Sequence, residues 1–166
     1  MIIIITGTPC TGKTSVSEEL AKIMKRAGTG FNVIHLNDIV LKNRLYAGTD
    51  KKRNAKDVDM KKLRKYLKAV TGKGGNFIIE SHFAHDLEGD IVFVLRTNPV
   101  ELERRMEEKE WAPEKIEENL EAERLNLIFG ESMDFHSHKV FEINTTGKTA
   151  LESAKEMSVI IWEMLS

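Results

Sequence analysis

The 166-residue sequence predicts an α/β fold in which a five-stranded parallel sheet carries helices on both faces. Two observations lead to this prediction. Five short apolar segments alternate with longer stretches in which apolar residues recur at helical spacing, and right-handed crossovers of this kind build a parallel sheet. The first apolar segment also runs without a gap into a glycine-rich loop that opens a helix. At this length we expect one domain, residues 1–166.

The first strand and the loop after it carry the strongest functional signal. Residues 1–6 are apolar, as in a buried strand, and residues 7–14 (GTPCTGKT) match the P-loop pattern GxxxxGK[ST]. Glycine allows backbone angles at which successive N–H groups point at the α- and β-phosphates of a nucleotide. Lys13 is expected to reach the β- and γ-phosphates, and Thr14 to offer its hydroxyl to Mg²⁺. The sequence therefore predicts a P-loop NTPase fold that binds a nucleoside triphosphate.

A predicted helix and a second strand follow the loop. Residues 15–25 place apolar side chains on one helical face, and residues 31–36 alternate as a strand does. Asp38 lies just past the end of this strand, where open parallel sheets bind ligands. Asp38 is therefore a candidate site residue, and it is equally suited to cap a helix over residues 39–45.

The next segment, residues 47–65, is polar and basic, with Gly48 expected in a loop and with Lys51, Lys52 and Arg53 in a row. A solvated surface is the usual explanation of such a charge run. The segment also lies between the second strand and a helix expected over residues 58–70, where some P-loop enzymes carry a small phosphate-accepting flap. The P-loop context favours the flap.

The third predicted strand, residues 76–80, ends in Glu80. A carboxylate at that place can hold the water shell of Mg²⁺ or orient a nucleophile, although it can also be a plain exposed strand end. His82 would point to the same side as Glu80 if the extended conformation continued. A structural hydrogen bond is the alternative role of this histidine.

The fourth predicted strand, residues 90–97, is apolar throughout its middle and is expected to be covered on both faces. Arg105, on the helix that follows, could cap that helix or approach a phosphate. Residues 108–115 then break the chain between two charged helices, which in the plainest interpretation is a corner. The second of these helices, residues 116–129, is expected to stop at Gly130.

Two histidines and a last strand–helix pair complete the chain. His136 and His138 are interpreted as surface residues, because the HxH spacing alone is a weak metal signal and no third ligand is near in sequence. Residues 139–143 form the fifth predicted strand. Residues 150–165 form the last predicted helix.

Composition limits the possible partners and the compartment. The 25 basic and 26 acidic residues nearly cancel, so direct nucleic-acid binding is not expected, nor binding to a membrane surface. The apolar start is too short for a signal peptide or a membrane span. Cys10 is the single cysteine, which excludes an intramolecular disulfide and favours the cytoplasm. Cys10 is either a small loop residue or, at a helix start, a reactive thiol.

Five segments together resemble the nucleoside monophosphate kinases, and among them the adenylate kinase isoenzyme 6 type, also called CINAP. They are GTPCTGKT, IHLND, IIESH, VFVLRT, and RMEEKEW with the following PEKIEENLEAE, and they span nearly the whole chain. The resemblance implies phosphoryl transfer from ATP to AMP with Mg²⁺. It also implies a flap for the monophosphate at about residues 35–58, which includes Asp38, and a short lid at about residues 108–118.

The resemblance also implies roles for individual residues. Glu80 and His82 fall on that family's Walker B acid, usually Asp, and its neighbouring histidine, so that Lys13, Glu80 and His82 would be catalytic and Thr14 and Glu80 would hold the metal. Lys109 falls where the lid normally carries Arg. The residues implied to contact ATP are Cys10, Gly12, Lys13, Thr14, Ser15, Lys109 and, in the loop beside adenine, Lys148.

Two functions of different class therefore stand. The first is an adenylate kinase that makes ADP from ATP and AMP. The second, also implied by the resemblance, is an ATPase that assists assembly of the small ribosomal subunit by binding a ribosomal protein, for which the basic residues 51–65 would be a natural contact. Because a short lid excludes water poorly, an ATPase side activity is expected in either case.

Overall fold

The computed structural model describes residues 1–50 and 55–165, and its centre is the predicted parallel sheet. The strand order is β2-β5-β1-β6-β7, and each neighbouring pair is parallel. The strands are β1 (Ile2–Gly7), β2 (Asn32–His35), β5 (Phe77–Glu80), β6 (Ile91–Arg96) and β7 (Val140–Asn144). The predicted fold class is thus confirmed.

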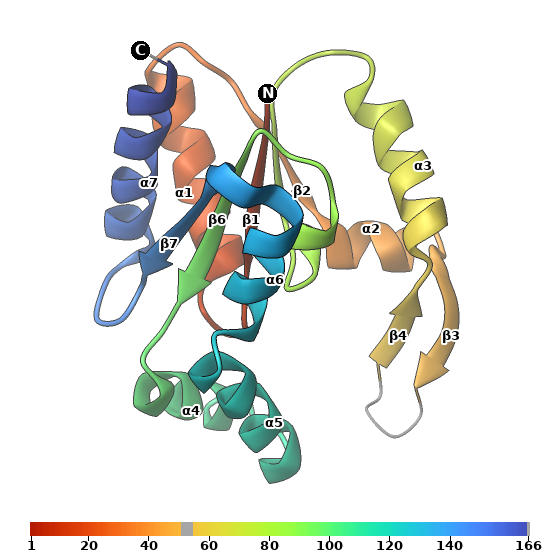
Figure 1. Ribbon diagram of the computed structural model, residues 1–166, viewed down its shortest axis with the longest axis vertical. Coiled ribbons are helices and arrows are strands. Elements are labelled where there is room, and N and C mark those ends of the chain that lie inside the picture. Colours follow the sequence, from red (N-terminus) through yellow and green to blue (C-terminus); the bar gives the residue numbers. More distant parts are fainter. Residues whose placement is uncertain (51–54, 166) are drawn as a thin grey trace.

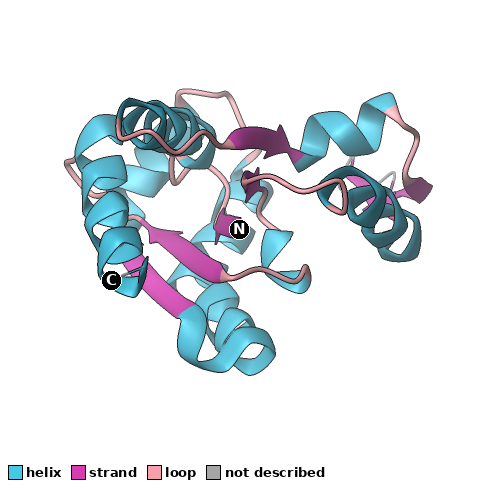
Figure 2. Ribbon diagram, turned by 90° about the horizontal axis from the view of Figure 1, so that it is seen from above, coloured by secondary structure: helices cyan, strands magenta, loops and turns pink. Residues whose placement is uncertain are grey.

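Helices cover the sheet on both faces, as Figures 1 and 2 show. One face packs against α1 (Lys13–Arg26) and α7 (Ala150–Leu165), whose side chains join Ile3, Ile5 and Phe93 in one core cluster. The other face packs against α2 (Leu36–Lys42), α3 (Met60–Thr71) and α6 (Leu127–His136). Because β1 and β6 are buried on both faces, their sequences are apolar without alternation.

Two smaller units project from this core (Figure 1). The helices α4 (Pro99–Glu107) and α5 (Pro113–Arg124) lie beyond the carboxyl end of β6 and pack together through a separate apolar cluster. The antiparallel hairpin of β3 (Tyr46–Asp50) and β4 (Ala55–Val58) lies beyond α2 and α3. Two short 3₁₀ helices, η1 (Ala84–Asp86) and η2 (Ser137–Lys139), complete the elements of the described residues.

The helix predicted over residues 39–45 begins three residues earlier, at Leu36. The chain passes from β2 into α2 without a loop, because Leu36 and Val40 form a buried i, i+4 pair. Asp38 therefore lies in the first turn of α2, and the helix-cap alternative for it is wrong. His35 occupies the cap position, in an extended conformation and without a side-chain cap bond.

The helix predicted over residues 116–129 is in fact two helices, and Gly130 stops neither. Asn126 has a left-handed conformation (φ 54°), which interrupts the hydrogen-bond ladder between α5 and α6. Gly130 lies inside α6. The apolar residues on both sides of the break, Leu125 and Leu127, are exposed, so their helical spacing did not mark a continuous buried face.

The polar segment 47–65 contains the β3–β4 hairpin instead of the loop expected around Gly48, which belongs to β3. Lys51, Lys52 and Arg53 lie outside the described residues. The following helix starts at Met60, where the Asp59 side chain caps it by accepting a hydrogen bond from the Lys62 backbone N–H at 3.0 Å. In the part of the chain that the structure describes, no helix is both long and apolar enough to cross a membrane.

Candidate active site

A cavity of about 620 Å³ lies between the P-loop and the α4–α5 unit, at the carboxyl ends of the strands. Eight of the ten residues predicted for the site line this one cavity. Its lining comprises Pro9, Cys10, Gly12, Lys13, Thr14, Ser15, Asn37, Glu80, His82, Arg105, Glu108, Lys109 and Trp111. Asp38 and Lys148 are not part of it.

The P-loop keeps its shape because its backbone takes conformations that most side chains resist. Gly7 has φ 138°, and a Cβ atom there would lie 2.3 Å from the Leu95 carbonyl oxygen of β6. Gly12, with φ 95°, occupies the cap position of α1. The loop therefore directs the free N–H groups of the α1 N-terminus toward the cavity, an arrangement suited to phosphate.

Lys13 is buried in the wall of the cavity. Its Nζ donates hydrogen bonds to the carbonyl oxygens of Gly7 at 2.9 Å and Thr8 at 3.0 Å. Burial lowers the pKa of Lys13 from 10.5 to about 8, against the opposing effect of the nearby Glu80 carboxylate. A buried ammonium held by neutral carbonyl groups is well placed to pair with an incoming phosphate oxygen.

Thr14 and Glu80 bring two oxygen ligands together. The Thr14 hydroxyl donates to Glu80 Oε1 at 3.2 Å, and Glu80 is only 6% exposed. A hydroxyl beside a carboxylate on a phosphate-binding loop fits Mg²⁺, which prefers hard oxygen ligands. The described residues contain no cluster of three or more His, Cys, Asp or Glu that could hold a metal, so further ligands would have to come from water or phosphate.

His35 is a site residue that the sequence analysis missed. Its Nδ1 lies 2.8 Å from Glu80 Oε1, and its Nε2 lies 4.0 Å from Glu18 Oε1. The two partners meet because His35 and Glu80 are register partners at the ends of β2 and β5. Glu80 therefore contacts both Thr14 and His35, which restricts its orientation.

His82 lines the cavity by a different route from the predicted one. β5 ends at Glu80, so the extended conformation does not continue, and a turn brings His82 to the cavity. Surrounding protein that displaces water, together with the charge of Lys13, holds the pKa of His82 well below its ordinary value of 6.5. The His82 side chain is exposed to the cavity, and with its pKa lowered it is neutral at pH 7.

The α4 helix supplies the opposite wall of the cavity. Arg105 Nη1 donates to the Cys10 carbonyl oxygen at 3.1 Å, and its Nη2 pairs with Glu101. Of the two roles open for Arg105, the approach to the phosphate loop is the one that the geometry supports. Lys109 is exposed and lines the cavity just after α4. The Lys115 ammonium lies over the Trp111 ring, 3.9 Å from the ring centroid.

Three predicted residues lie elsewhere. Asp38 is exposed beside Asn37, which does line the cavity. Lys148 pairs with Glu156 at 2.6 Å. His136 is half-buried and not a surface residue, because its Nε2 bonds to the His85 carbonyl oxygen at 2.8 Å. The side chain of His138 lies outside the described residues.

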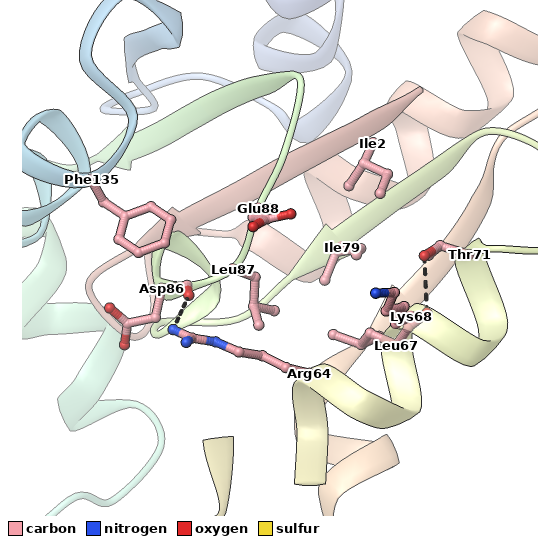
Figure 3. Close-up of a pocket in the computed structure, with 10 residues that line it drawn as sticks. All are labelled: Ile2, Arg64, Leu67, Lys68, Thr71, Ile79, Asp86, Leu87, Glu88 and Phe135. Atoms are coloured by element: carbon pink, nitrogen blue, oxygen red, sulfur yellow. Dashed lines mark hydrogen bonds between the residues drawn. The ribbon is translucent and has the colours of Figure 1, made fainter. Parts of the chain in front are cut away.

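A second cavity, of about 330 Å³, lies apart from the P-loop between α3 and the η1 segment (Figure 3). Arg64 reaches across it from α3 and donates to the Asp86 carbonyl oxygen at 2.8 Å. Leu67 and Leu87 give it apolar walls, and Phe135 of α6 stands at its edge. No P-loop residue lines it, so we assign it no part in phosphate binding.

The comparisons with known proteins agree with this geometry. A family model described as an AAA domain matches residues 3–126. A Methanosarcina acetivorans protein named "Putative adenylate kinase" is 43% identical over 172 residues, which cover 100% of this chain and 89% of that protein. A Thermococcus kodakarensis protein of the same name is 35% identical, over 97% of this chain and 85% of its own.

A solved structure shares the fold. Thymidylate kinase from Candida albicans superimposes with a TM-score of 0.61 over 98% of this chain and 91% of its own. The sequence identity is 14%, so this likeness supports the fold alone.

Proposed function

This chain belongs to the P-loop nucleoside monophosphate kinases, and from that premise we propose that it is an adenylate kinase, which transfers the γ-phosphoryl group of ATP to AMP and forms two ADP. One observation carries the proposal. Lys13, Thr14 and Glu80 on one wall of the cavity face the cations Arg105 and Lys109 on the other. Phosphoryl transfer depends mainly on such positioning and charge stabilisation.

Each wall has its part in the proposed reaction. The P-loop N–H groups bind the ATP phosphates, and Lys13 offsets charge on the transferred group. Thr14 and Glu80 would hold Mg²⁺, which when bound supplies positive charge beside the phosphates. Neutral His82 accepts or donates a hydrogen bond at the cavity edge, next to where the acceptor must lie.

The remaining assignments are proposals of the same kind. The flap, about residues 35–58, binds the monophosphate with Asp38 at its start, and the lid, about residues 108–118, brings Lys109 to ATP. Lys148 flanks the adenine. The start of the flap adjoins the cavity through Asn37, which supports this assignment.

An ATPase side activity follows from the size of the lid. Lys109 and Trp111 stand on a short connection between two helices, which leaves much of the cavity open to water. The finer classification, the isoenzyme 6 type, is part of the proposal. The relatives reported above name no ribosomal protein, so the role in ribosome assembly stays a prediction.

A coupled assay of ATP consumption tests the proposal. We expect slow consumption without an acceptor, strong stimulation by AMP, and less by CMP, UMP or GMP. Consumption that no monophosphate stimulates would contradict the kinase proposal and leave an ATPase. Product analysis that finds two ADP per ATP consumed would identify AMP as the acceptor.

Charge reversal tests the flap separately. Replacement of Lys51, Lys52 and Arg53 by Glu should raise the KM for AMP without a change in the KM for ATP, because only the monophosphate site would lose positive charge. If both KM values are the same in variant and wild type, the basic segment is only a solvated surface.

A further inference from the structure

Glu123 of α5 is a buried carboxylate with three donors around it. It is 2% exposed. Its Oε1 accepts from Arg96 Nε at 2.6 Å and from the Thr97 backbone N–H at 3.0 Å, and its Oε2 accepts from the Thr8 hydroxyl at 2.5 Å. A buried carboxylate is stable only when it is paired and hydrogen-bonded, and here Arg96 and Thr97 already serve one oxygen. The second oxygen is directed at the P-loop.

Thr8 connects this carboxylate to the lysine of the site. The same residue that donates its hydroxyl to Glu123 accepts, through its carbonyl oxygen, hydrogen bonds from Lys13 Nζ at 3.0 Å and from the Thr11 hydroxyl at 2.8 Å. The other acceptor of Lys13 is the Gly7 carbonyl, which the sheet holds. One of the two acceptors that orient Lys13 is therefore held from α5.

We propose that Glu123 is a positioning residue for phosphate binding. It fixes the Thr8 peptide through the hydroxyl, and the Thr8 carbonyl in turn directs the Lys13 ammonium toward the cavity. Since α5 packs on α4, which carries Arg105, the same contact ties the two walls of the cavity together. The inference rests on the proposed function only in that Lys13 acts on a nucleotide phosphate.

A purely structural Glu123 would hold Arg96 and the end of β6 and nothing more. Substitution of Thr8 distinguishes this structural role from the positioning role. Thr8→Val removes the hydroxyl that Glu123 holds and leaves the contacts of Glu123 with Arg96 and Thr97. Thr8→Ser restores the hydroxyl. Glu142→Gln is the matched control, since it removes the charge of the exposed second partner of Arg96, which pairs at 3.1 Å, and leaves Glu123 unchanged.

The experiment measures kcat and KM for AMP phosphorylation and, separately, the affinity for ADP by calorimetry without Mg²⁺. We expect Thr8→Val to lower kcat about tenfold or more and to weaken ADP binding several-fold, because a displaced catalytic group is costly even when the shift is small. Thr8→Ser should stay within about threefold of wild type, and Glu142→Gln should match wild type in both readouts.

Wild-type kcat and ADP affinity in Thr8→Val, with or without a lowered Tm, would overturn the proposal. If Thr8→Val does not fold, Glu123→Gln decides by the same two readouts, and wild-type values there would equally overturn it. Failure of the adenylate kinase proposal gives a different result from failure of the Glu123 proposal. In that case AMP would not stimulate wild-type turnover, while the ADP affinities of the Thr8 variants would still report on the position of Lys13.

Discussion

The two walls of the cavity are built differently. On the P-loop wall Lys13 and Glu80 are 8% and 6% exposed, and hydrogen bonds fix both. On the opposite wall Glu108 and Lys109 are exposed, and α4 and α5 pack through a small cluster that is separate from the two main cores. The P-loop wall is thus ordered before a nucleotide binds. The α4–α5 wall combines the half-buried, hydrogen-bonded Arg105 with the solvated side chains of Glu108 and Lys109.

The contrast suggests a division of tasks. A preorganised wall stabilises charge without reorganisation during the reaction, whereas a solvated wall can move to exclude water and complete the site. Substitutions on the P-loop wall should therefore lower the chemical rate strongly. Substitutions of the solvated Lys109 on the α4–α5 wall should instead change the partition between transfer and hydrolysis.

The largest expected effect is that of Lys13→Ala. Loss of the ammonium should lower kcat/KM for AMP phosphorylation by about a thousandfold or more, because no other group on this wall can take its place. The fold should remain intact, as circular dichroism and the Tm would show, since Lys13 contacts loop carbonyls and not the core. Lys22→Ala, on the exposed face of the same helix, is the control. Activity within a few-fold of wild type would show that the ordered P-loop wall does not carry the chemical step.

Glu80→Gln should lower phosphoryl transfer by about a hundredfold, the scale of a lost charge-stabilising or acid–base group. The amide keeps the size of the side chain and still allows nucleotide binding, which calorimetry can measure. Glu88→Gln, beside the second cavity, is the control. Unchanged activity with a lowered Tm would instead assign Glu80 a structural role at the strand end.

Arg105→Lys tests the contact between the two walls. An ammonium keeps the charge but cannot reach the Cys10 carbonyl and Glu101 together, so we expect kcat/KM to fall about tenfold. Arg104→Lys is the neighbouring control, because Arg104 is exposed and pairs only with Glu108 among the contacts described. Equal losses in both variants would mean that the contact with the P-loop has no special part.

The smallest effects concern Lys109. Lys109→Arg should raise the ratio of AMP phosphorylation to ATP hydrolysis a few-fold, and Lys109→Ala should lower it, because a guanidinium closes on phosphates with less loss of order per hydrogen bond. Both rates are measured in both variants, with Lys155→Ala, at an exposed position of α7, as the control. A ratio that does not move in Lys109→Ala would make residues 108–118 only a helical corner.

Sequence reasoning identified the sheet and most of the cavity because both depend on local patterns. The apolar runs mark the strands, and the P-loop motif together with the position of Glu80 at a strand end marks one wall. The break at Asn126 was missed since a single left-handed residue leaves no mark in apolar periodicity. Similarly, the β3–β4 hairpin was missed because only Tyr46 and Val58, at its base, pack against the core among the described residues, and two positions make no strand pattern.

The missed site residues depend on contacts between distant parts of the chain. His35 is 45 residues from Glu80, and Glu123 is 115 residues from Thr8, so neither pair shares a motif. The strand order β2-β5-β1 brings the first pair together, and the packing of α5 brings the second. An expectation of strand order would have placed His35 beside Glu80, whereas no local signal marks Glu123.

The single thiol of the chain has a practical consequence. Cys10 is partly exposed and lines the cavity where the two walls meet, and its carbonyl is the contact point of Arg105. A small environment-sensitive fluorophore coupled to its sulfur would lie at the cavity, and no other thiol would take the label. The unmodified sequence thus contains its own attachment point for a reporter, from which the arrival of a nucleotide could be followed by stopped-flow fluorescence.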